Sequence, residues 1–199
     1  LVFNSCNLER NKDFQGTSIL VIADSHYYAP RLGTTGAAFQ AYIAGDRKLI
    51  AESQAITEAA LEKILASNVQ IVLVAGDLTK DGELASHQDF ANYLSQIEAS
   101  GKMVFVVPGN HDVNNHEARG YTNAGPVSVP TVSADDFASI YYAFGFGEAI
   151  DRDPNSLSYI VEPVEGLWIF CLDSCRYREN IHHSITGGRF SSDTLSWIK

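Results

Sequence analysis

Apolar runs and amphipathic segments alternate along the first half of the chain. Three runs rich in valine, isoleucine and leucine cover residues 18–23, 69–75 and 103–107, and their length is typical of strands buried on both faces. Apolar residues at helical spacing fill the two intervals between these runs, and Gly101 ends the second interval. The residues expected on the inner sides of the two helices are Ile50, Ile56, Ala60, Leu61 and Ile64 in the first and Phe90, Leu94 and Ile97 in the second. This order predicts a parallel sheet with right-handed crossovers, and therefore an α/β fold.

The remaining segments have weaker patterns. Residues 27–46 and 116–130 are rich in glycine and in proline, tyrosine or small residues, so we expect two long loops. Three further elements are predicted: a helix that Ser133 caps and that ends near Gly145, a hairpin of residues 158–161 and 167–172, and a short helix that opens at Ser191 or Ser192.

The composition indicates one globular domain. The chain has 199 residues, of which 45% are hydrophobic and 19% charged, so it is long enough to bury a core. We assign residues 18–199 to this domain and residues 1–17 to an N-terminal extension. The net charge of −10 argues against a nucleic-acid partner, which requires a basic face. No apolar run reaches the roughly 20 residues that span a bilayer.

The N-terminal extension contains a cysteine in an informative context. Residues 1–6, which end in Ser5 and Cys6, resemble the end of a bacterial lipoprotein signal, in which a small residue precedes the acylated cysteine. We expect Cys6 to attach the protein to a membrane surface outside the cytoplasm, in the periplasm or on the cell surface. Because no basic segment precedes this run, a free thiol in a cytoplasmic protein is the alternative. Cys171 and Cys175 are not expected to form a disulfide framework.

Each of the three apolar runs is followed by a short polar block. The first block contains Asp24 and His26, the second contains Asp77, and the third contains Asn110 and His111. The carboxyl ends of parallel strands meet at one edge of a sheet, where ligands bind, so we expect these side chains to converge. Carboxylate, imidazole and amide groups bind divalent metal ions, which a hydrolase uses to activate water. A single aspartate after a strand is more often a cap or a turn residue, so the prediction depends on all three blocks together.

The motifs Asp-x-His, Gly-Asp and Gly-Asn-His-Asp, in this order, resemble the calcineurin-like metallophosphoesterase superfamily. The second motif continues with Leu-Thr at residues 78–79, and Val-Val-Pro at residues 106–108 precedes the third, as is usual in that family. The segments around Asp173 and Arg189 are similar to its cyclic-nucleotide phosphodiesterase-like branch. The similarity runs from Ile19 to the last residue. It implies a two-metal centre within an α/β/β/α sandwich.

The resemblance assigns the metal ligands position by position. Asp24 and His26 would bind the first metal, Asp77 would bridge both metals, and Asn110 would bind the second. Manganese, iron and zinc all accept this mixture of oxygen and nitrogen ligands, so the sequence does not choose among them. Two divalent transition-metal ions are the cofactors that the resemblance implies.

Two residues of the third motif would lie beside the metals without binding them. By the resemblance, His111 faces the scissile phosphate as a proton donor, a role that contributes roughly 10²–10⁴-fold to the rate. Asp112 would orient an imidazole from outside the set of metal ligands.

One part of the family pattern is missing. The family completes its site with a further histidine on a later strand and with a Gly-His-x-His element, and the chain has neither. His182 and His183 lie in a polar segment before the last helix and are not expected to substitute. The second metal would keep only Asp77 and Asn110, so we expect weak or absent turnover from the 199 residues alone. The resemblance thus implies a sandwich that is incomplete at its C-terminal end, part of a longer protein.

The expected function is metal-dependent hydrolysis of a small phosphomonoester or phosphodiester. The alternative is a non-catalytic domain of the same fold that binds metal or another surface. A serine hydrolase is disfavoured because no Gly-x-Ser-x-Gly motif occurs. The sequence makes no prediction of the oligomeric state.

Other polar and aromatic residues have structural as well as functional explanations. His87 on a helix face and His116 in a loop are expected to be solvated. Asp173 follows a strand on the same side as the polar blocks, so it either faces substrate or supports the ligands. Three tyrosines of the first long loop either contact the leaving group or pack together: Tyr27, Tyr28 and Tyr42.

Overall fold

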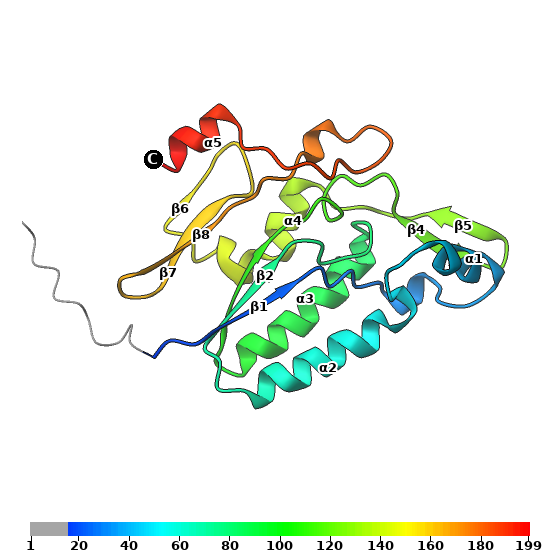
Figure 1. The fold of residues 1–199 in the computed structure, drawn as a ribbon, viewed down its shortest axis with the longest axis horizontal. Coiled ribbons are helices and arrows are strands. Elements are labelled where there is room, and N and C mark those ends of the chain that lie inside the picture. The colour runs from blue at the N-terminus through cyan, green and yellow to red at the C-terminus, as the bar shows by residue number, and fades with distance from the viewer. Residues whose placement is uncertain (1–15) are drawn as a thin grey trace, which may run out of the picture.

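A three-stranded parallel sheet lies at the centre of the structure, a computed structural model that describes residues 16–199 (Figure 1). Strands β1 (Ile19–Ala23), β2 (Ile71–Ala75) and β3 (Met103–Val107) are neighbours in the order β1-β2-β3. The register sets Ala23 beside Ala75 and Ala75 beside Val107, so all three strands end at one edge. The three predicted strands are confirmed, and the polar blocks that follow them start from a common line.

The expected membrane attachment falls on a part of the chain that is not described. Cys6 lies outside residues 16–199, so attachment through this cysteine stays a prediction. Within residues 16–199 no helix combines the length and the hydropathy that crossing a bilayer would require.

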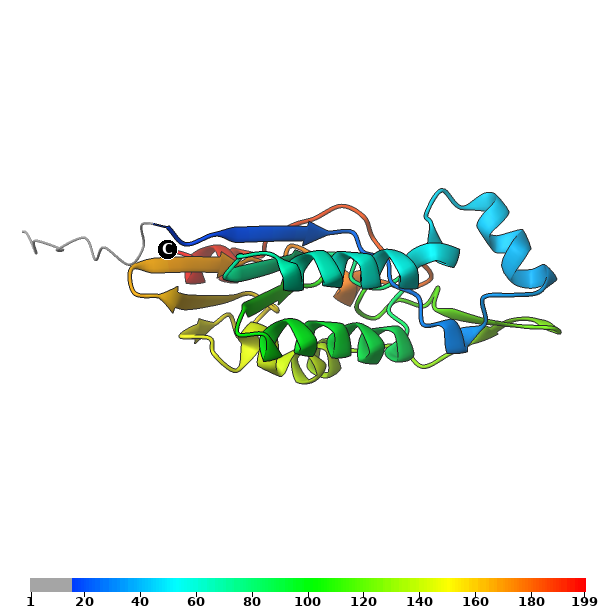
Figure 2. The same ribbon diagram turned by 90° about the horizontal axis from the view of Figure 1, so that it is seen from below.

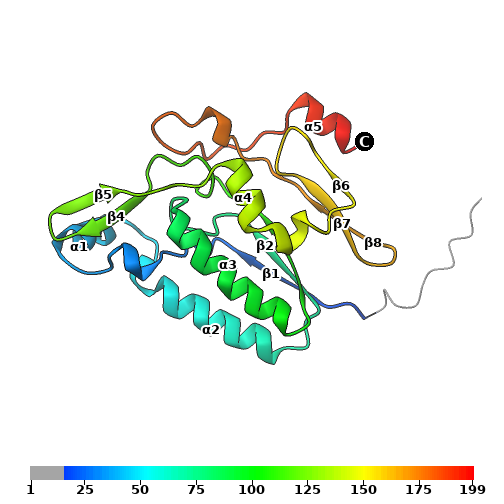
Figure 3. The same ribbon diagram turned by 180° about the vertical axis from the view of Figure 1, so that it is seen from behind.

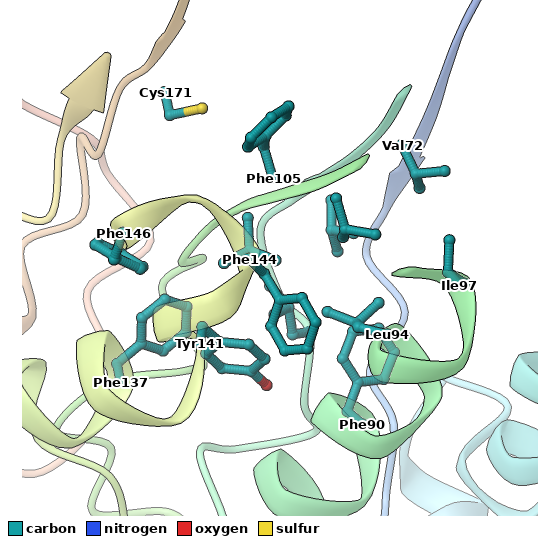
Figure 4. Packing of buried hydrophobic residues seen from close by; sticks show 14 of the residues in the cluster. Val72, Phe90, Leu94, Ile97, Phe105, Phe137, Tyr141, Phe144, Phe146 and Cys171 are labelled. Carbon is teal, nitrogen blue, oxygen red and sulfur yellow. The ribbon is translucent and has the colours of Figure 1, made fainter. Parts of the chain in front are cut away.

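Two long helices cover one face of the first sheet (Figure 2). Helix α2 (Ser53–Ala66) precedes β2, and helix α3 (Leu84–Ala99) connects β2 to β3. Most residues that the helical pattern places inward are buried, namely Leu61, Ile64, Phe90, Leu94 and Ile97. Figure 4 shows Phe90 and Leu94 of α3 near the aromatic side chains of Tyr141 and Phe144. In the same view Phe105 of β3 points toward Cys171, and the residues on both sides of β3 belong to one core cluster.

Two residues expected on the inner side of α2 lie elsewhere. Ile56 is 48% exposed, because it lies at the border of the buried stripe, beside a cavity that α2 shares with β1 and α3. Ile50 is buried, but in a 3-10 turn (Ile50–Glu52) before the helix, where it packs with Tyr28 and Phe39. The helical spacing therefore predicts the later turns of α2 correctly and its start wrongly.

A second, antiparallel sheet packs against the first. Its strands follow the order β6-β7-β8, with β6 (Asp151–Arg152), β7 (Tyr159–Val164) and β8 (Leu167–Cys171), and β7 and β8 form the predicted hairpin. The Tyr159 hydroxyl reaches β3, where it donates a hydrogen bond to the Val106 carbonyl (2.7 Å) and accepts one from the Val106 N–H (3.0 Å). This tyrosine joins the two sheets by satisfying backbone groups of β3 that no strand within residues 16–199 pairs.

Helix α5 (Ser192–Trp197) completes the layers. It begins where predicted, since the Ser191 hydroxyl accepts a hydrogen bond from the Thr194 N–H at 3.0 Å. In Figure 1 the helices α2 and α3, the first sheet, the second sheet and α5 follow one another. The predicted α/β fold with an α/β/β/α layering is confirmed.

Helix α4 (Ala134–Ile140) begins at Ser133, as predicted. The Ser133 hydroxyl accepts a hydrogen bond from the Asp136 N–H (3.2 Å), and the Asp136 carboxylate accepts one from the Ser133 N–H (3.0 Å), which forms a capping box. A turn (Tyr142–Phe146) follows, and Gly145 within it has a φ of 115°. Figure 3 shows α4 alongside α3, which it contacts.

Two segments with the composition of loops contain regular structure, so the prediction of two long loops is wrong. The reason is tertiary packing: Phe39 and Tyr121, one from each segment, are in contact with ring centroids 5.4 Å apart, and each segment lacks a strong pattern of its own. The elements are a 3-10 turn (Pro30–Leu32) and helix α1 (Ala37–Gly45) in the first segment, and the antiparallel strands β4 (Arg119–Thr122) and β5 (Gly125–Ser128) in the second.

Strand β1 is more exposed than its apolar sequence predicts. It is the edge strand of the first sheet, and the side chains of Ile19 and Val21 are 45% and 61% exposed. Leu20 and Ile22, on the opposite face, pack against the core. The prediction of burial on both faces is wrong for this strand, because within residues 16–199 nothing covers the face of Ile19 and Val21.

His87 is fully buried, so the prediction that it is solvated is wrong. It lies three residues before Phe90 on the inner face of α3, and its Nδ1 is 2.8 Å from the Tyr141 hydroxyl. Its Nε2 is 2.9 Å from the Asp112 carbonyl oxygen, which is an acceptor, so Nε2 carries the proton of a neutral ring. Burial lowers the pKa of His87 to about 4.

The burial of His87 makes stability fall in mild acid. Between pH 6.5 and about pH 4 the unfolded chain binds a proton that the folded chain excludes, so His87 should cost about 2 kcal/mol of the free energy of unfolding between pH 7.5 and pH 5. Urea unfolding at the two pH values should show a smaller loss, by about that amount, in His87→Gln than in the wild type. The exposed histidine variant His116→Gln is the matched control. Equal losses in all three proteins would contradict the prediction.

Candidate metal centre

The chain that leaves β1 stays hydrogen-bonded to the chain that leaves β2. The Asp24 N–H donates to the Gly76 carbonyl at 3.1 Å, and the His26 N–H donates to the Asp77 carbonyl at 2.9 Å. The parallel pairing of the two strands therefore continues beyond their ends. It places Asp24 and His26 beside Asp77, although about fifty residues separate them in the sequence.

Three side chains of these segments form a group with the spacing of metal ligands. Asp24, His26 and Asp77 each offer one ligand atom, and these atoms lie within 4.8 Å of one another. The His26 Nε2 is 3.8 Å from the Asp77 Oδ2, and the His26 Nδ1 is buried without a hydrogen-bond partner in residues 16–199. Two carboxylates and an imidazole with an unsatisfied nitrogen fit a divalent metal ion.

The electrostatic surroundings keep the His26 imidazole in the form that binds metal. Burial lowers the pKa of His26 below its ordinary value, and the nearby Lys48 ammonium lowers it further, while the Asp77 carboxylate acts in the opposite direction. The neutral ring is therefore favoured, and only the neutral ring has a lone pair for a metal.

All three residues of this group have an unusual backbone conformation. The φ angles of Asp24, His26 and Asp77 are 54°, 41° and 44°, and Asn114 is the one other non-glycine residue with positive φ in the described part of the chain. Residues other than glycine rarely adopt a positive φ, because this conformation costs of order 1–3 kcal/mol for each residue. Residues held in it cluster at functional sites. The conformation thus supports a functional assignment on grounds independent of the side chains.

The third polar block lies against the second. The backbone of Gly109 packs so closely on Asp77 that a Cβ at this position would overlap the Asp77 backbone. The His111 N–H donates a hydrogen bond to the Asp77 Oδ1 at 3.0 Å. Asn110 lines the same surface hollow as Asp24 and Asp77. The expected convergence of the three blocks is therefore present in the structure.

Asp112 supports the site in a different way from the one expected. Its carboxylate accepts hydrogen bonds from the backbone N–H groups of Leu78 (3.0 Å), Thr79 (2.9 Å) and Gly109 (2.7 Å), and from the Thr79 hydroxyl (2.9 Å). The carboxylate makes no hydrogen bond to an imidazole in the described part of the chain, which corrects the expectation; it is the backbone carbonyl of Asp112 that contacts one, the ring of His87. The function of the carboxylate is to tie the loop after β2 to the loop after β3, because buried N–H groups of both need an acceptor.

The carboxylate that orients His111 is Asp81. Its Oδ1 is 2.8 Å from the His111 Nδ1, and the His111 Nε2 on the other side of the ring is 3.4 Å from the Lys48 Nζ. Burial alone would lower the pKa of His111, but the hydrogen bond to Asp81 and the charge of Asp77 raise it above its ordinary value. The His111 ring stands edge to face with the His26 ring, with centroids 5.2 Å apart.

A buried cation holds Asp81 in place. The Lys80 ammonium is almost inaccessible to solvent, is paired with Asp81, lies 3.7 Å from Glu83 and stacks 4.5 Å from the centroid of the Tyr42 ring. Burial opposes ionisation of Asp81, but the hydrogen bond from His111 and the charge of Lys80 bring its pKa below the ordinary value. Asp81 therefore stays an anion beside His111.

The other residues considered from the sequence lie away from the metal ligands or serve the packing. Tyr27 and Tyr28 are fully buried, and Tyr42 lies over Lys80, so loop packing is their observed environment. Asp173 is buried and accepts hydrogen bonds from the N–H groups of Leu157 (3.1 Å) and Cys175 (2.8 Å), which fixes its own loop. Three histidines are exposed in loops, as expected: His116, His182 and His183.

A comparison with models of protein families matches residues 17–179 to the calcineurin-like phosphoesterases. The chain belongs to this family. A comparison with curated proteins finds no significant match. Calcineurin-like phosphoesterases generally use divalent metal ions to hydrolyse phosphoesters, and the group of Asp24, His26 and Asp77 gives this family member a candidate metal site. The assignment to a cyclic-nucleotide phosphodiesterase-like branch stays a prediction.

Asp81 and Lys48 are the residues of the site that the sequence does not reveal. Asp81 is adjacent to Lys80 and four residues after Asp77, which gives it the appearance of a turn residue. Lys48 follows α1 in a segment without a motif, 63 residues before its contact with His111. Neither residue belongs to a recognisable sequence motif, so only the folded arrangement identifies them.

Proposed function

We propose that this calcineurin-like phosphoesterase is a metal-dependent hydrolase of phosphomonoesters or phosphodiesters. The observation that carries the proposal is the convergence of Asp24, His26 and Asp77, with ligand atoms within 4.8 Å of one another, in a chain of this family. Two carboxylates and a neutral imidazole suit manganese, iron or zinc. Divalent ions held by these residues would polarise the phosphoryl group and activate water for attack on phosphorus.

Asp77 and Asn110 extend the proposed site to a second metal ion. The two oxygens of Asp77 face different neighbours, since Oδ2 is 3.8 Å from the His26 Nε2 and Oδ1 accepts the His111 N–H at 3.0 Å. A carboxylate in this position is suited to bridge two ions. Asp24 and His26 would complete one side, and Asn110, which lines the same hollow, would bind on the other.

His111 is the proposed proton donor to the leaving alcohol. Its hydrogen bond to Asp81 fixes the ring, so that Nε2 is the nitrogen directed away from the Asp81 support. Lys48 places a positive charge 3.4 Å from that nitrogen. A phosphoester bound here would have its oxygens attracted by Lys48 and its leaving oxygen within reach of His111.

The proposal is tested with the full 199-residue chain and simple chromogenic esters. Because residues 16–199 offer few ligands for a second ion, we expect slow but measurable hydrolysis of p-nitrophenyl phosphate or bis-p-nitrophenyl phosphate after loading with manganese, iron or zinc. A chelator should abolish this reaction until metal is returned. p-Nitrophenyl acetate, which has the same leaving group and no phosphorus, is the control substrate. Hydrolysis that is insensitive to the chelator, or no hydrolysis of either phosphoester with any of the metals, would count against the proposal.

A second candidate function is metal binding without turnover. The observation that favours it is the small number of ligands for a second ion. Within residues 16–199, the one group of three or more His, Cys, Asp or Glu side chains with ligand spacing is Asp24, His26 and Asp77. Metal analysis distinguishes the two candidates. Bound metal without hydrolysis of any phosphoester would favour the non-catalytic domain.

A further inference from the structure

A cavity of about 340 Å³ opens beside the metal ligands and extends between β1, α2 and α3. Its inner wall is apolar and consists of Ile22, Leu61, Ile64, Phe90, Leu94 and Ile97. Asp24 and His26 line the cavity at one end, so the cavity and the candidate metal site share two residues. This volume falls within the range of small-molecule sites, which are typically apolar with a few polar groups at one place.

The entrance of the cavity is also apolar. Leu49 and Ile56 line it, and their side chains are 64% and 48% exposed. Leu49 belongs to the segment that carries Lys48, and Ile56 lies in the first turns of α2. An apolar molecule could therefore pass from solvent to the inner wall along apolar side chains, and it would cover both residues when bound.

Away from the end formed by residues 24–26 and Lys48, the polar side chains along the walls already have partners within the protein. The Ser53 hydroxyl accepts a hydrogen bond from the Tyr28 N–H (3.1 Å), and the Thr57 hydroxyl donates to the Ser53 carbonyl (2.8 Å). The Tyr93 hydroxyl donates to the Glu58 carboxylate (3.1 Å). These walls therefore offer little to the hydroxyls of a sugar or the edges of a nucleobase, which would lose their hydrogen bonds to water on entering.

Charge is confined to the end of the cavity where the chemistry is proposed. Lys48 lines the cavity and lies 3.4 Å from the His111 Nε2. A ligand that fills the cavity and reaches this end would be apolar along its length and anionic at its tip. The cavity would thus bind the apolar part of a ligand along its walls and the anionic part at the end formed by Lys48 and the metal ligands.

We infer that the substrates are phosphoesters of long, apolar aliphatic alcohols, with the chain in the cavity and the phosphate at Lys48 and the metal ligands. This inference rests on the proposed function and names its substrate class. Each methylene buried in the cavity should favour binding by about threefold to fourfold until the cavity is full. Nucleotides and sugar phosphates of the same charge should be poor substrates.

The first experiment separates failure of this inference from failure of the proposed function. Calorimetric titration of the full chain with decylphosphonate and ethylphosphonate, which are not hydrolysed, measures binding without turnover. We expect decylphosphonate, used below its critical micelle concentration, to bind at least a hundredfold more tightly. Equal affinities would overturn the inference, whether or not the protein hydrolyses phosphoesters. For the metal-loaded protein, kcat/KM should rise with chain length, from ethyl phosphate through hexyl phosphate to decyl phosphate.

A matched pair of variants locates the effect in the cavity. Ala60 lines the cavity from α2, whereas its neighbour Ala59 is exposed on the outer side of the helix. Ala60→Phe should reduce the affinity ratio of decylphosphonate to ethylphosphonate at least tenfold, and Ala59→Phe should keep the wild-type ratio. A folded Ala60→Phe protein with the wild-type ratio would overturn the inference. Ile56→Gln, at the half-exposed entrance, should lower decylphosphonate affinity severalfold and serves if Ala60→Phe does not fold.

Discussion

Asp77→Asn is expected to remove most of the bound metal and to reduce phosphoester hydrolysis by at least about 10³-fold. The amide has the shape of the carboxylate, and asparagine tolerates the positive φ at this position, so the loops should keep their structure. What is lost is the negative charge next to His26 and His111, and with it several kcal/mol of interaction with the metal ions. Metal content by mass spectrometry and initial rates on an aryl phosphate measure the two effects.

The control for this variant is Asp135→Asn, which makes the same chemical change at an exposed position in the first turn of α4. It should keep both the metal content and the rate of the wild type. An Asp77→Asn protein with full metal content would show that Asp77 is not a ligand. Loss of metal with an unchanged rate would instead contradict the metal dependence of the reaction.

His111→Ala is expected to lower the rate by about 10²–10⁴-fold and to leave metal content within about twofold of the wild type. The polar contacts of the His111 side chain are with Asp81 and Lys48, neither of which is a predicted metal ligand. The hydrogen bond from the His111 backbone N–H to Asp77 is kept in the alanine variant. Rate and metal content should therefore separate here, in contrast to Asp77→Asn, where both should fall together.

His116→Ala, an exposed loop histidine, is the matched control for His111→Ala. Asp81→Asn adds a second measurement, since it keeps the His111 ring and removes the anion that orients it. We expect a smaller loss of rate than in His111→Ala. A His111→Ala protein with the wild-type rate would remove His111 from the mechanism, and one that loses its metal would assign His111 to the ligands.

The part of the fold that carries the site follows from the sequence because it depends on a simple geometric rule. Each apolar run is a strand, and consecutive parallel strands end at one edge, so Asp24, Asp77 and Asn110 must emerge near one another. The continued pairing of the chain beyond β1 and β2 brings them closer than this rule alone requires. Local pattern and overall topology agree here, which makes the prediction robust.

The elements that sequence reasoning missed are those stabilised by contacts with distant residues. Helix α1 and the β4–β5 hairpin are short and pack on each other through Phe39 and Tyr121, so neither has a pattern that stands alone. Asp81 and Lys48 meet His111 across 30 and 63 residues, and no local spacing encodes such a contact. His87 differs, because its position three residues before Phe90 already indicated the buried face of α3.

At three positions of the candidate metal centre, the positive φ angles make the residue that suits metal binding different from the residue that would be most stable. Glycine adopts such angles without steric cost, so Gly in place of Asp24, His26 or Asp77 would relax the backbone and delete a ligand in the same step. Mutations that favour folding and mutations that keep the reaction are thus opposed at these sites. Evolution toward greater stability alone would erode the centre first, and a descendant that no longer needed the reaction would be free to accumulate glycine there.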